Sequence, residues 1–257
     1  MGLVDEQGKL SFCDGHLRVV DAAGNVVSSF APQDYRNHLL ETVDPWSYAK
    51  PLHFKGSRIQ GSTSEDDRII YRVGPLARLN VASGLTTLLA QEESDRMFDH
   101  LGGKPVHNVW VYHWARLIEL LHAAERMLAI ADVDALTGSH IRNLPEKILG
   151  EGIGACEAPR GTLIHHYRSD AHGVVRELNL LVATQHNLAA LSGSITQAAR
   201  KFIRAGEVTE GLVNMVEMAF RAYDPCLACA VHAVDTGADM AINIRDHKWR
   251  LIKTIHR

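Results

Sequence analysis

The chain has 257 residues, of which 46% are hydrophobic and 22% charged, an ordinary composition for a globular protein with a substantial core. Its formal net charge of −3 creates no strong field that a nucleic acid or an anionic membrane surface would recognise. The apolar runs are too short to span a bilayer and the first residues lack the pattern of a secretory signal, so we expect a cytoplasmic protein without a membrane span.

The first third of the chain is predicted to form strands. LSFCDGHLRVVDAAGNVVSSF (residues 10–30) alternates apolar and polar residues around a turn at Ala23-Gly24-Asn25, which indicates a hairpin. A polar, Gly- and Ser-rich loop, KGSRIQGSTSEDDR, follows, and then a short strand candidate, RIIYRVG. We therefore expect residues 1–83 to form a β-rich lobe.

Helices are predicted to follow. LTTLLAQEESDRMFDHL (residues 85–101) suits an amphipathic helix that ends at Gly102-Gly103. The clearest helical pattern covers residues 114–133, and its apolar side chains recur at spacings of three and four. The predicted buried face consists of Leu117, Leu120, Leu121, Ala124, Met127 and Leu128.

Further along, LNLLVAT predicts a buried strand that leads into a helix at SITQAARKFI. Thr209 fits the N-cap of a helix over EGLVNMVEMAFRAY, which Pro225 ends or restarts. We expect residues 84–232 to form a helical core. The whole chain would be a single α+β domain, helix-dominated, with an N-terminal β-hairpin lobe.

The stretch RAYDPCLACAVHAV places Cys226, Cys229 and His232 at the spacing C-x2-C-x2-H, in a chain with only four cysteines. If Pro225 opens a helical turn, the three side chains lie on one face, where the helix dipole favours thiolates. Thiolates suit zinc, copper(I), nickel or iron. On spacing alone, a metal or redox role and a pair of packed core cysteines are about equally favoured.

Longer sequence motifs favour a metal-binding role for Cys226 and Cys229 over a packing role. RAYDPCLACAVH resembles the D-P-C-x-x-C-x-x-H motif of nickel–iron hydrogenase large subunits, the catalytic subunits of these enzymes. The stretch EAPRG (residues 157–161) resembles a second signature of that family, and VGPLAR (residues 73–78) resembles a third; all occur in the family's order. The HHY and TQHN stretches resemble its cytoplasmic branch, which couples to nicotinamide, deazaflavin or heterodisulfide reduction.

The resemblance implies a nickel held by four cysteine thiolates, two of which bridge to an iron that carries carbon monoxide and cyanide. Cys226 matches the terminal nickel ligand and Cys229 the bridging ligand. His232 matches a ligand of a nearby magnesium, and Leu180 matches the residue whose backbone carbonyl faces that magnesium.

The resemblance also implies roles in the reaction, the reversible heterolytic oxidation of dihydrogen. Arg160 would overhang the site, close to a cyanide and the bound dihydrogen, and Thr184 would hydrogen-bond cyanide. The Cys226 thiolate is a natural proton acceptor. This chain has too few cysteines for iron–sulfur clusters, so electrons would leave through an iron–sulfur small subunit, followed by further electron-transfer subunits.

The chain departs from the family pattern at both ends. It has no R-x-C-G-x-C motif, which in the family supplies the other nickel ligands, so we expect only the C-terminal portion of a large subunit, inactive by itself. Residues 233–257 follow His232, where family precursors are cut, and we interpret this stretch as a tail removed by a maturation protease, with a strand or a short helix in it.

Two other functions stay open. A quinone-binding relative from respiratory complexes shares the fold but should lack the C-x-x-C pair. A non-catalytic fragment would bind zinc, or nothing, at the cysteines.

Several residues near these motifs are expected to be structural. The glycines of GEGIGACEAPRG indicate a tight turn rather than a phosphate loop, with Cys156 packed beside it. His165 and His166 are expected to be hydrogen-bonded scaffolding. Arg78 is expected to anchor a carboxylate, and Glu157 to be held by backbone or arginine contacts.

Overall fold

The computed structural model describes residues 1–45, 47–58, 67–139, 141–142, 147–204, 206–231 and 241–256. Of the residues that the structure describes, 39% are helical and 25% lie in strands. The predicted α+β class is therefore confirmed, whereas the expected dominance of helices is not.

The N-terminal sheet contains the predicted hairpin. Its strands are β1 (Gly2–Val4), β2 (His16–Val20) and β3 (Val26–Phe30), antiparallel in that order. The turn between β2 and β3 is closed by Asp21, whose carboxylate accepts from the backbone N–H groups of Ala23 and Asn25. Gly24 takes a positive φ of 91° there, which side-chain-bearing residues adopt only with strain.

This hairpin does not form a lobe of its own. Leu17 and Phe30 belong to one cluster of buried side chains with Ile164 and Leu181, which come from much later in the chain. The N-terminal strands are thus part of the same body as the C-terminal half.

A second small sheet follows, antiparallel in the order β4-β5-β6. Its strands are β4 (Leu39–Glu41), β5 (Leu52–Lys55) and β6 (Arg68–Ile69). Two short helices, η1 (Pro32–Asp34) and α1 (Tyr35–His38), precede β4, and a third, η2 (Gly56–Arg58), follows β5. The predicted strand RIIYRVG pairs over only two residues, and its continuation buries Tyr71 and Val73.

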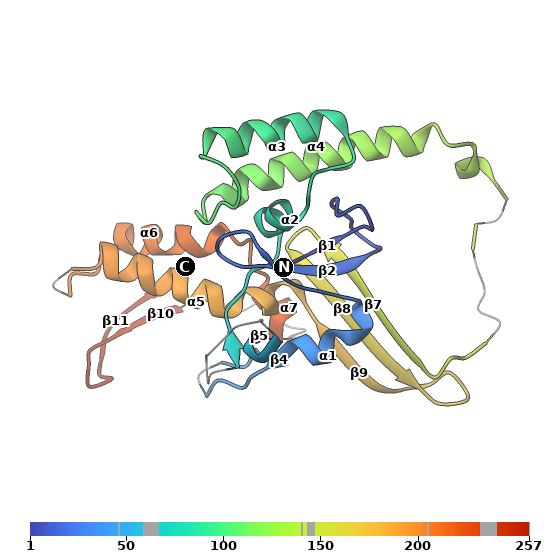
Figure 1. Cartoon of the computed structure of the whole chain (residues 1–257). Coiled ribbons are helices and arrows are strands. Elements are labelled where there is room, and N and C mark those ends of the chain that lie inside the picture. The colour runs from blue at the N-terminus through green and yellow to red at the C-terminus, as the bar shows by residue number, and fades with distance from the viewer. Residues whose placement is uncertain are drawn as a thin grey trace.

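The third sheet is the longest and lies within the stretch expected to be a helical core. It consists of β7 (Glu151–Ala158), β8 (Gly161–Ser169) and β9 (Val175–Leu181), antiparallel in that order (Figure 1). Gly152 and Gly154 lie inside β7, opposite Tyr167 and His165, so the tight turn predicted there is wrong. Glycine can adopt extended backbone as well as turns, and pairing with β8 decides between them here.

Helices α3 and α4 lie side by side along one edge of the molecule (Figure 1). The helices before β7 are α2 (Pro75–Val81), α3 (Leu88–His100), α4 (Val111–Ala131) and the short η3 (Asp134–Thr137). Helix α3 ends before Gly102-Gly103, as predicted.

The predicted buried face of α4 is wrong except for Leu121, which is half-buried and packs against the core. Leu117, Leu120, Met127 and Leu128 are 64–71% exposed. The buried residues of α4 are Val111, Tyr112, Ala115, Ile118, Glu119 and His122. Helices α2 and α3 pack on that other face, and the C-terminal half of α4 extends beyond α3 (Figure 1).

The C-terminal part begins with β9 and continues directly into a long helix. Its elements are α5 (Ala183–Phe202), α6 (Glu210–Arg221), α7 (Leu227–Val231) and the hairpin β10 (Ala241–Arg245) to β11 (Leu251–His256). A strand over the first part of LNLLVAT is confirmed, but it ends at Leu181, the one residue of this stretch in β9 that is buried. The following helix starts at Ala183 rather than at Ser194. Thr209 caps α6 as predicted, since its hydroxyl accepts from the Leu212 N–H at 3.3 Å.

Two buried clusters make up the core. One joins α2, α3 and α4 with Ala190, Leu191 and Tyr223, and the other joins the three-stranded sheets. The expected division of the chain into residues 1–83, 84–232 and 233–257 stays a prediction.

Candidate metal centre

Four of the candidate site residues, Arg160, Thr184, Cys226 and Cys229, come from segments that the third sheet and α5 bring together. Arg160 lies in the two-residue turn between β7 and β8. Thr184 is the second residue of α5, and Cys226 and Cys229 lie at the start of α7, which packs against α5. Leu180 lies in β9, opposite His165 of β8.

Close backbone packing joins the Arg160 turn to the VGPLAR segment. Gly161 has a φ of 144°, and a Cβ at this position would collide with the side chain of Val73. A Cβ on Gly74 would lie 3.0 Å from the Arg160 carbonyl oxygen. Both positions therefore require glycine, and VGPLAR and EAPRG form one unit.

A buried ion-pair network fixes the strand that leads into this turn. The Arg78 guanidinium binds both carboxylate oxygens of Glu119, at 2.7 and 2.5 Å. It also donates to the Glu157 carboxylate and to the Ala158 carbonyl, each at 2.8 Å. The Thr162 hydroxyl donates to the second Glu157 oxygen. Arg78 thus anchors carboxylates, as expected, and Glu157 is a held structural group.

Arg160 reaches the segment that precedes the thiols. Its Nε donates to the Asp224 carbonyl at 2.7 Å and lies 3.2 Å from the Asp224 carboxylate. Asp224 has a positive φ of 52° and is followed by Pro225, so the chain turns sharply at this point. The Asp224 carboxylate thus pairs with Arg160.

Thr184 touches the first thiol residue. Its hydroxyl oxygen accepts from the backbone N–H of Cys226 at 3.0 Å, and its side chain is buried. A hydroxyl that accepts this bond still has its own proton to donate.

The two thiols themselves are joined. The sulfurs of Cys226 and Cys229 form a disulfide with an S–S distance of 2.11 Å, and their Cα atoms are 5.3 Å apart. The pair therefore points to one place, as the spacing predicted. Because only free thiolates bind a metal, this pair must be reduced first.

The donor set fits part of a metal site. Two adjacent sulfurs suit one soft cation, but the described part of the chain holds no group of three or more His, Cys, Asp or Glu side chains that could bind a metal. His232 lies outside the described residues.

The two histidines of HHY have local partners. His166 is buried between the Tyr35 hydroxyl, 3.0 Å from its Nδ1, and the Glu151 carboxylate, 2.8 Å from its Nε2. His165 contacts the hydroxyl of Tyr167. These contacts agree with the expected scaffolding role.

The TQHN stretch has a structural role that the sequence did not reveal. The Asn187 side chain accepts from the Val73 N–H at 2.9 Å and donates to the Val73 carbonyl, so it mimics a strand partner. His186 is fully buried, and its Nδ1 lies 2.5 Å from the Tyr71 hydroxyl. Helix α5 is thereby tied to Tyr71 and to Val73, the first residue of VGPLAR, and in the sequence only the polar cluster at a helix start hinted at this.

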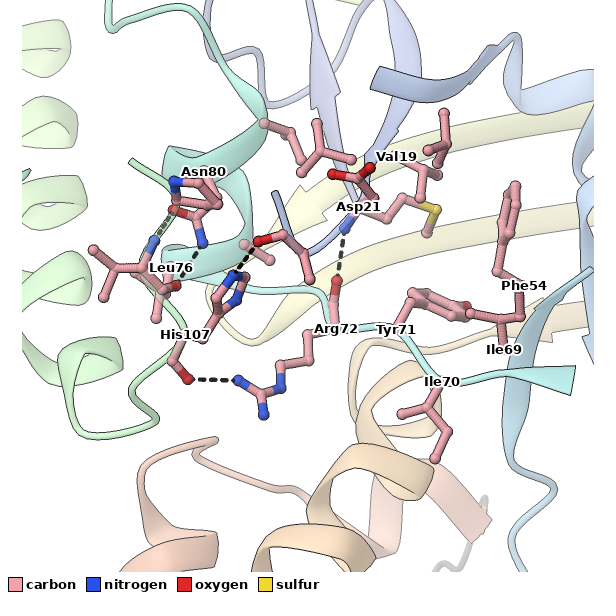
Figure 2. A pocket seen from close by; sticks show the side chains of 18 of the residues that line it. Val19, Asp21, Phe54, Ile69, Ile70, Tyr71, Arg72, Leu76, Asn80 and His107 are labelled. Carbon is pink, nitrogen blue, oxygen red and sulfur yellow. Dashed lines mark hydrogen bonds between the residues drawn. The ribbon is translucent and has the colours of Figure 1, made fainter. Parts of the chain in front are cut away.

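A pocket of about 370 Å³ lies away from this site, between the N-terminal sheet and α2 (Figure 2). Its lining is mainly apolar, with Val19, Phe54, Ile69 and Tyr71 on one side. The Arg72 guanidinium beside it donates to the His107 carbonyl (Figure 2). Of the candidate residues that the structure describes, none lines this pocket.

The same described segments include no helix long and apolar enough to cross a bilayer.

Comparisons with known proteins agree with the motifs. A family model described as nickel-dependent hydrogenase matches residues 38–232. An iron–sulfur subunit of the F420-non-reducing hydrogenase of Archaeoglobus profundus is 43% identical over 256 residues, which cover 99% of this chain and 52% of that protein. The NAD-reducing hydrogenase HoxS subunit beta of Cupriavidus necator is 38% identical over 256 residues, covering 98% and 51%.

A solved structure is similar as well. The crystal structure of an NAD⁺-reducing [NiFe]-hydrogenase in the H2-reduced state superposes with a TM-score of 0.81 at 41% identity. The match covers 90% of this chain and 50% of that one. The chain thus spans about half the length of the relatives it matches.

Proposed function

The chain belongs to the nickel-dependent hydrogenase family, and from this premise we propose that it is one half of a hydrogenase catalytic subunit that oxidises dihydrogen reversibly. The half-length coverage of its relatives supports the proposal that a further segment completes the subunit. By itself, the 257-residue chain is expected to be inactive.

One observation carries this proposal: the EAPRG turn and the start of the TQHN helix both contact the segment that carries the thiol pair. The Thr184 hydroxyl binds the backbone of Cys226, and Arg160 binds Asp224, two residues before that cysteine. These residues come from separate segments of the chain, and the fold brings them together at the thiol pair.

In the reduced chain, Cys226 and Cys229 would hold nickel, and Cys229 would also contact an iron with carbon monoxide and cyanide ligands. The remaining thiolates would come from the completing segment. His232 and the Leu180 carbonyl would serve a magnesium ion. Thr184 and Arg160 would donate hydrogen bonds to cyanide.

When bound, the nickel–iron centre supplies the site at which dihydrogen is split heterolytically. This chain's own residues would handle charge and protons around it. The Cys226 Sγ would accept the proton, and the Arg160 guanidinium, which is always charged, would stabilise negative charge close by. The Asp224 contacts would hold that guanidinium in place.

Partners follow from the chemistry and the surface. Electrons would pass to an iron–sulfur small subunit, then to further electron-transfer subunits, in the cytoplasm. The exposed apolar face of α4 supports a contact with another polypeptide, because large exposed apolar patches mark interaction surfaces. We also propose that residues 233–257 are removed by a maturation protease after metal insertion.

The decisive experiment is metal analysis of the complete subunit, produced with its completing segment and its partner subunits. Cys226→Ser and Cys229→Ser should each reduce nickel content to background and abolish dihydrogen uptake. Cys13→Ser, at an exposed free cysteine, is the matched control and should retain nickel. Nickel retained by the Cys226→Ser protein would refute the ligand assignment, and zinc alone in the unmodified protein would favour a non-catalytic fragment.

Arg160→Lys separates binding from turnover in the same preparation. A lysine ammonium keeps the charge but loses both the Nε that donates to Asp224 and the planar fork, so nickel content should be unchanged while turnover falls at least about tenfold. Equal turnover of the two proteins would show that the guanidinium has no part in the reaction.

A further inference from the structure

Two cysteines outside the candidate metal centre lie close to each other. Cys13 and Cys156 are both free thiols in the structure. The Glu157 N–H donates to the Phe12 carbonyl at 2.7 Å. Cys13 follows Phe12 in the sequence, and Cys156 precedes Glu157. Residues 143 positions apart in the sequence are thereby held side by side along the outer edge of β7.

Neighbouring side chains show which way the thiols point. The Phe12 ring packs against the Arg78 guanidinium, 6.0 Å from its centroid, and the Glu157 carboxylate binds that same guanidinium. Both side chains therefore occupy the Arg78 side. Because successive residues of a strand point to opposite faces, Cys156 in β7 points away from Arg78. Cys13 follows Phe12 and is exposed.

The electrostatics support this proximity. Burial raises the pKa of the Cys156 thiol, and the nearby Cys13 thiolate raises it further. Two groups influence each other in this way only at short range. Cys13 is also the more accessible of the two, since it is exposed while Cys156 is half-buried.

We propose that Cys13 and Cys156 form a reversible dithiol–disulfide pair that reacts with small disulfides. The Cys13 thiolate attacks one sulfur of the small disulfide and releases one small thiol. The Cys156 thiolate then attacks the Cys13 sulfur of the mixed disulfide and releases the second small thiol. In the balance, two protein thiols are oxidised to a disulfide, and one small disulfide is reduced to two thiols.

This cross-link would tie the segment after β1 to the strand that carries the EAPRG stretch. It would lie on the opposite side of β7 from the Arg78 network and would use neither Cys226 nor Cys229. The pair is therefore a redox-modification site distinct from the candidate metal centre, and it does not depend on the proposed function.

The test uses the full chain with Cys226→Ser and Cys229→Ser, which leaves Cys13 and Cys156 as its two cysteines. After incubation with oxidised glutathione and alkylation of free thiols, intact-mass measurement should show the loss of two hydrogen atoms and no glutathionyl adduct. Digestion without reductant should yield one cross-linked species that contains residues 13 and 156.

Matched variants identify the pathway. With Cys156→Ser added, the chain should retain one glutathionyl group on Cys13, because no second thiol can displace it. A stable glutathionyl group on Cys13 beside an alkylated Cys156, unreacted thiols, or disulfide-linked dimers in the parent protein would each overturn the proposal. If the Cys226→Ser/Cys229→Ser chain does not fold, the same digestion is applied to the unmodified chain. The Cys13–Cys156 and Cys226–Cys229 disulfides fall in different peptides, so a cross-linked species with residues 13 and 156 supports the proposal and its absence overturns it.

Discussion

Arg78 shows how one residue can organise a site that it does not enter. Its side chain is 1% exposed, and it joins Glu119 on α4 to Glu157 on β7. A buried guanidinium is tolerated only when its donors and the facing carboxylates satisfy each other, as they do here. The sequence predicted the anchoring role but not its two partners.

Arg78→Met keeps most of the apolar stem and removes the charge, which leaves two buried carboxylates without their partner. We expect the free energy of unfolding to fall by about 3–5 kcal/mol, measured by chemical denaturation. Arg96→Met is the matched control, because Arg96 forms an exposed pair with Glu93 and should cost less than about 1 kcal/mol. Equal losses in the two variants would contradict the structural role of the network.

His186 makes the stability of the fold depend on pH. Burial lowers its pKa from an ordinary value of 6.5 to about 3, with the charge of the Met1 amino terminus as a smaller cause. The unfolded chain therefore binds a proton near pH 6.5, whereas the folded chain resists it. Stability from this residue is complete above pH 6.5 and is lost as the pH falls toward 3.

Between about pH 7 and about pH 5, we expect this single group to remove about 2 kcal/mol from the free energy of unfolding. His186→Gln should flatten that part of the pH profile, while His16→Gln, at an exposed position, should leave it unchanged. Urea titrations at the two pH values measure the difference. An unchanged slope in the His186→Gln protein would show that this histidine is not the titrating group.

At the scale of elements, α4 carries apolar side chains on two faces. Ile118 is buried against α2 and α3, while Leu120 and Met127 are about two-thirds exposed. Hydrophobic periodicity alone identified the exposed face as the buried one. Periodicity reports where apolar residues lie on a helix, and the neighbouring elements decide which of two such faces is covered first.

Because α4 buries Ile118 and exposes Leu120 and Met127, substitutions on its two faces should differ in their effect on stability. Ile118→Ala should lower the free energy of unfolding by about 2–5 kcal/mol, because it opens a cavity in the core. Leu120→Lys together with Met127→Lys should change it by less than about 1 kcal/mol and should reduce self-association in light scattering. The opposite order of stability losses would restore the interpretation from periodicity.

At the scale of the whole molecule, the C-terminal tail adds no described residue to the two main clusters, although Ile255 of β11 is buried. Neither large cluster of described buried residues includes a residue after Tyr223. The strands β10 and β11 pair with each other (Figure 1). We therefore expect a chain that ends at residue 232 to unfold cooperatively, with a free energy of unfolding within about 1–2 kcal/mol of the full chain. Loss of cooperative unfolding in this truncated chain would show that the tail is part of the fold.

Much of the fold followed from local pattern. The β2–β3 hairpin, the end of α3 at its two glycines and the Thr209 cap depend on turn and cap chemistry within a few residues, and all were predicted. The position of Gly152 and Gly154 was not, because a glycine fits both a turn and a strand and the partner strand decides.

For the candidate site, the sequence by itself determined the residue types and their order: a thiol pair at a spacing that brings the sulfurs together, and an arginine and a threonine in matching motifs. Only the tertiary structure decided that Thr184 holds the backbone of Cys226, that Arg160 pairs with Asp224, and that Cys13 lies beside Cys156. The physical reason is sequence separation. Contacts between residues about 40 to 140 positions apart depend on how sheets and helices pack, and no local propensity encodes that packing.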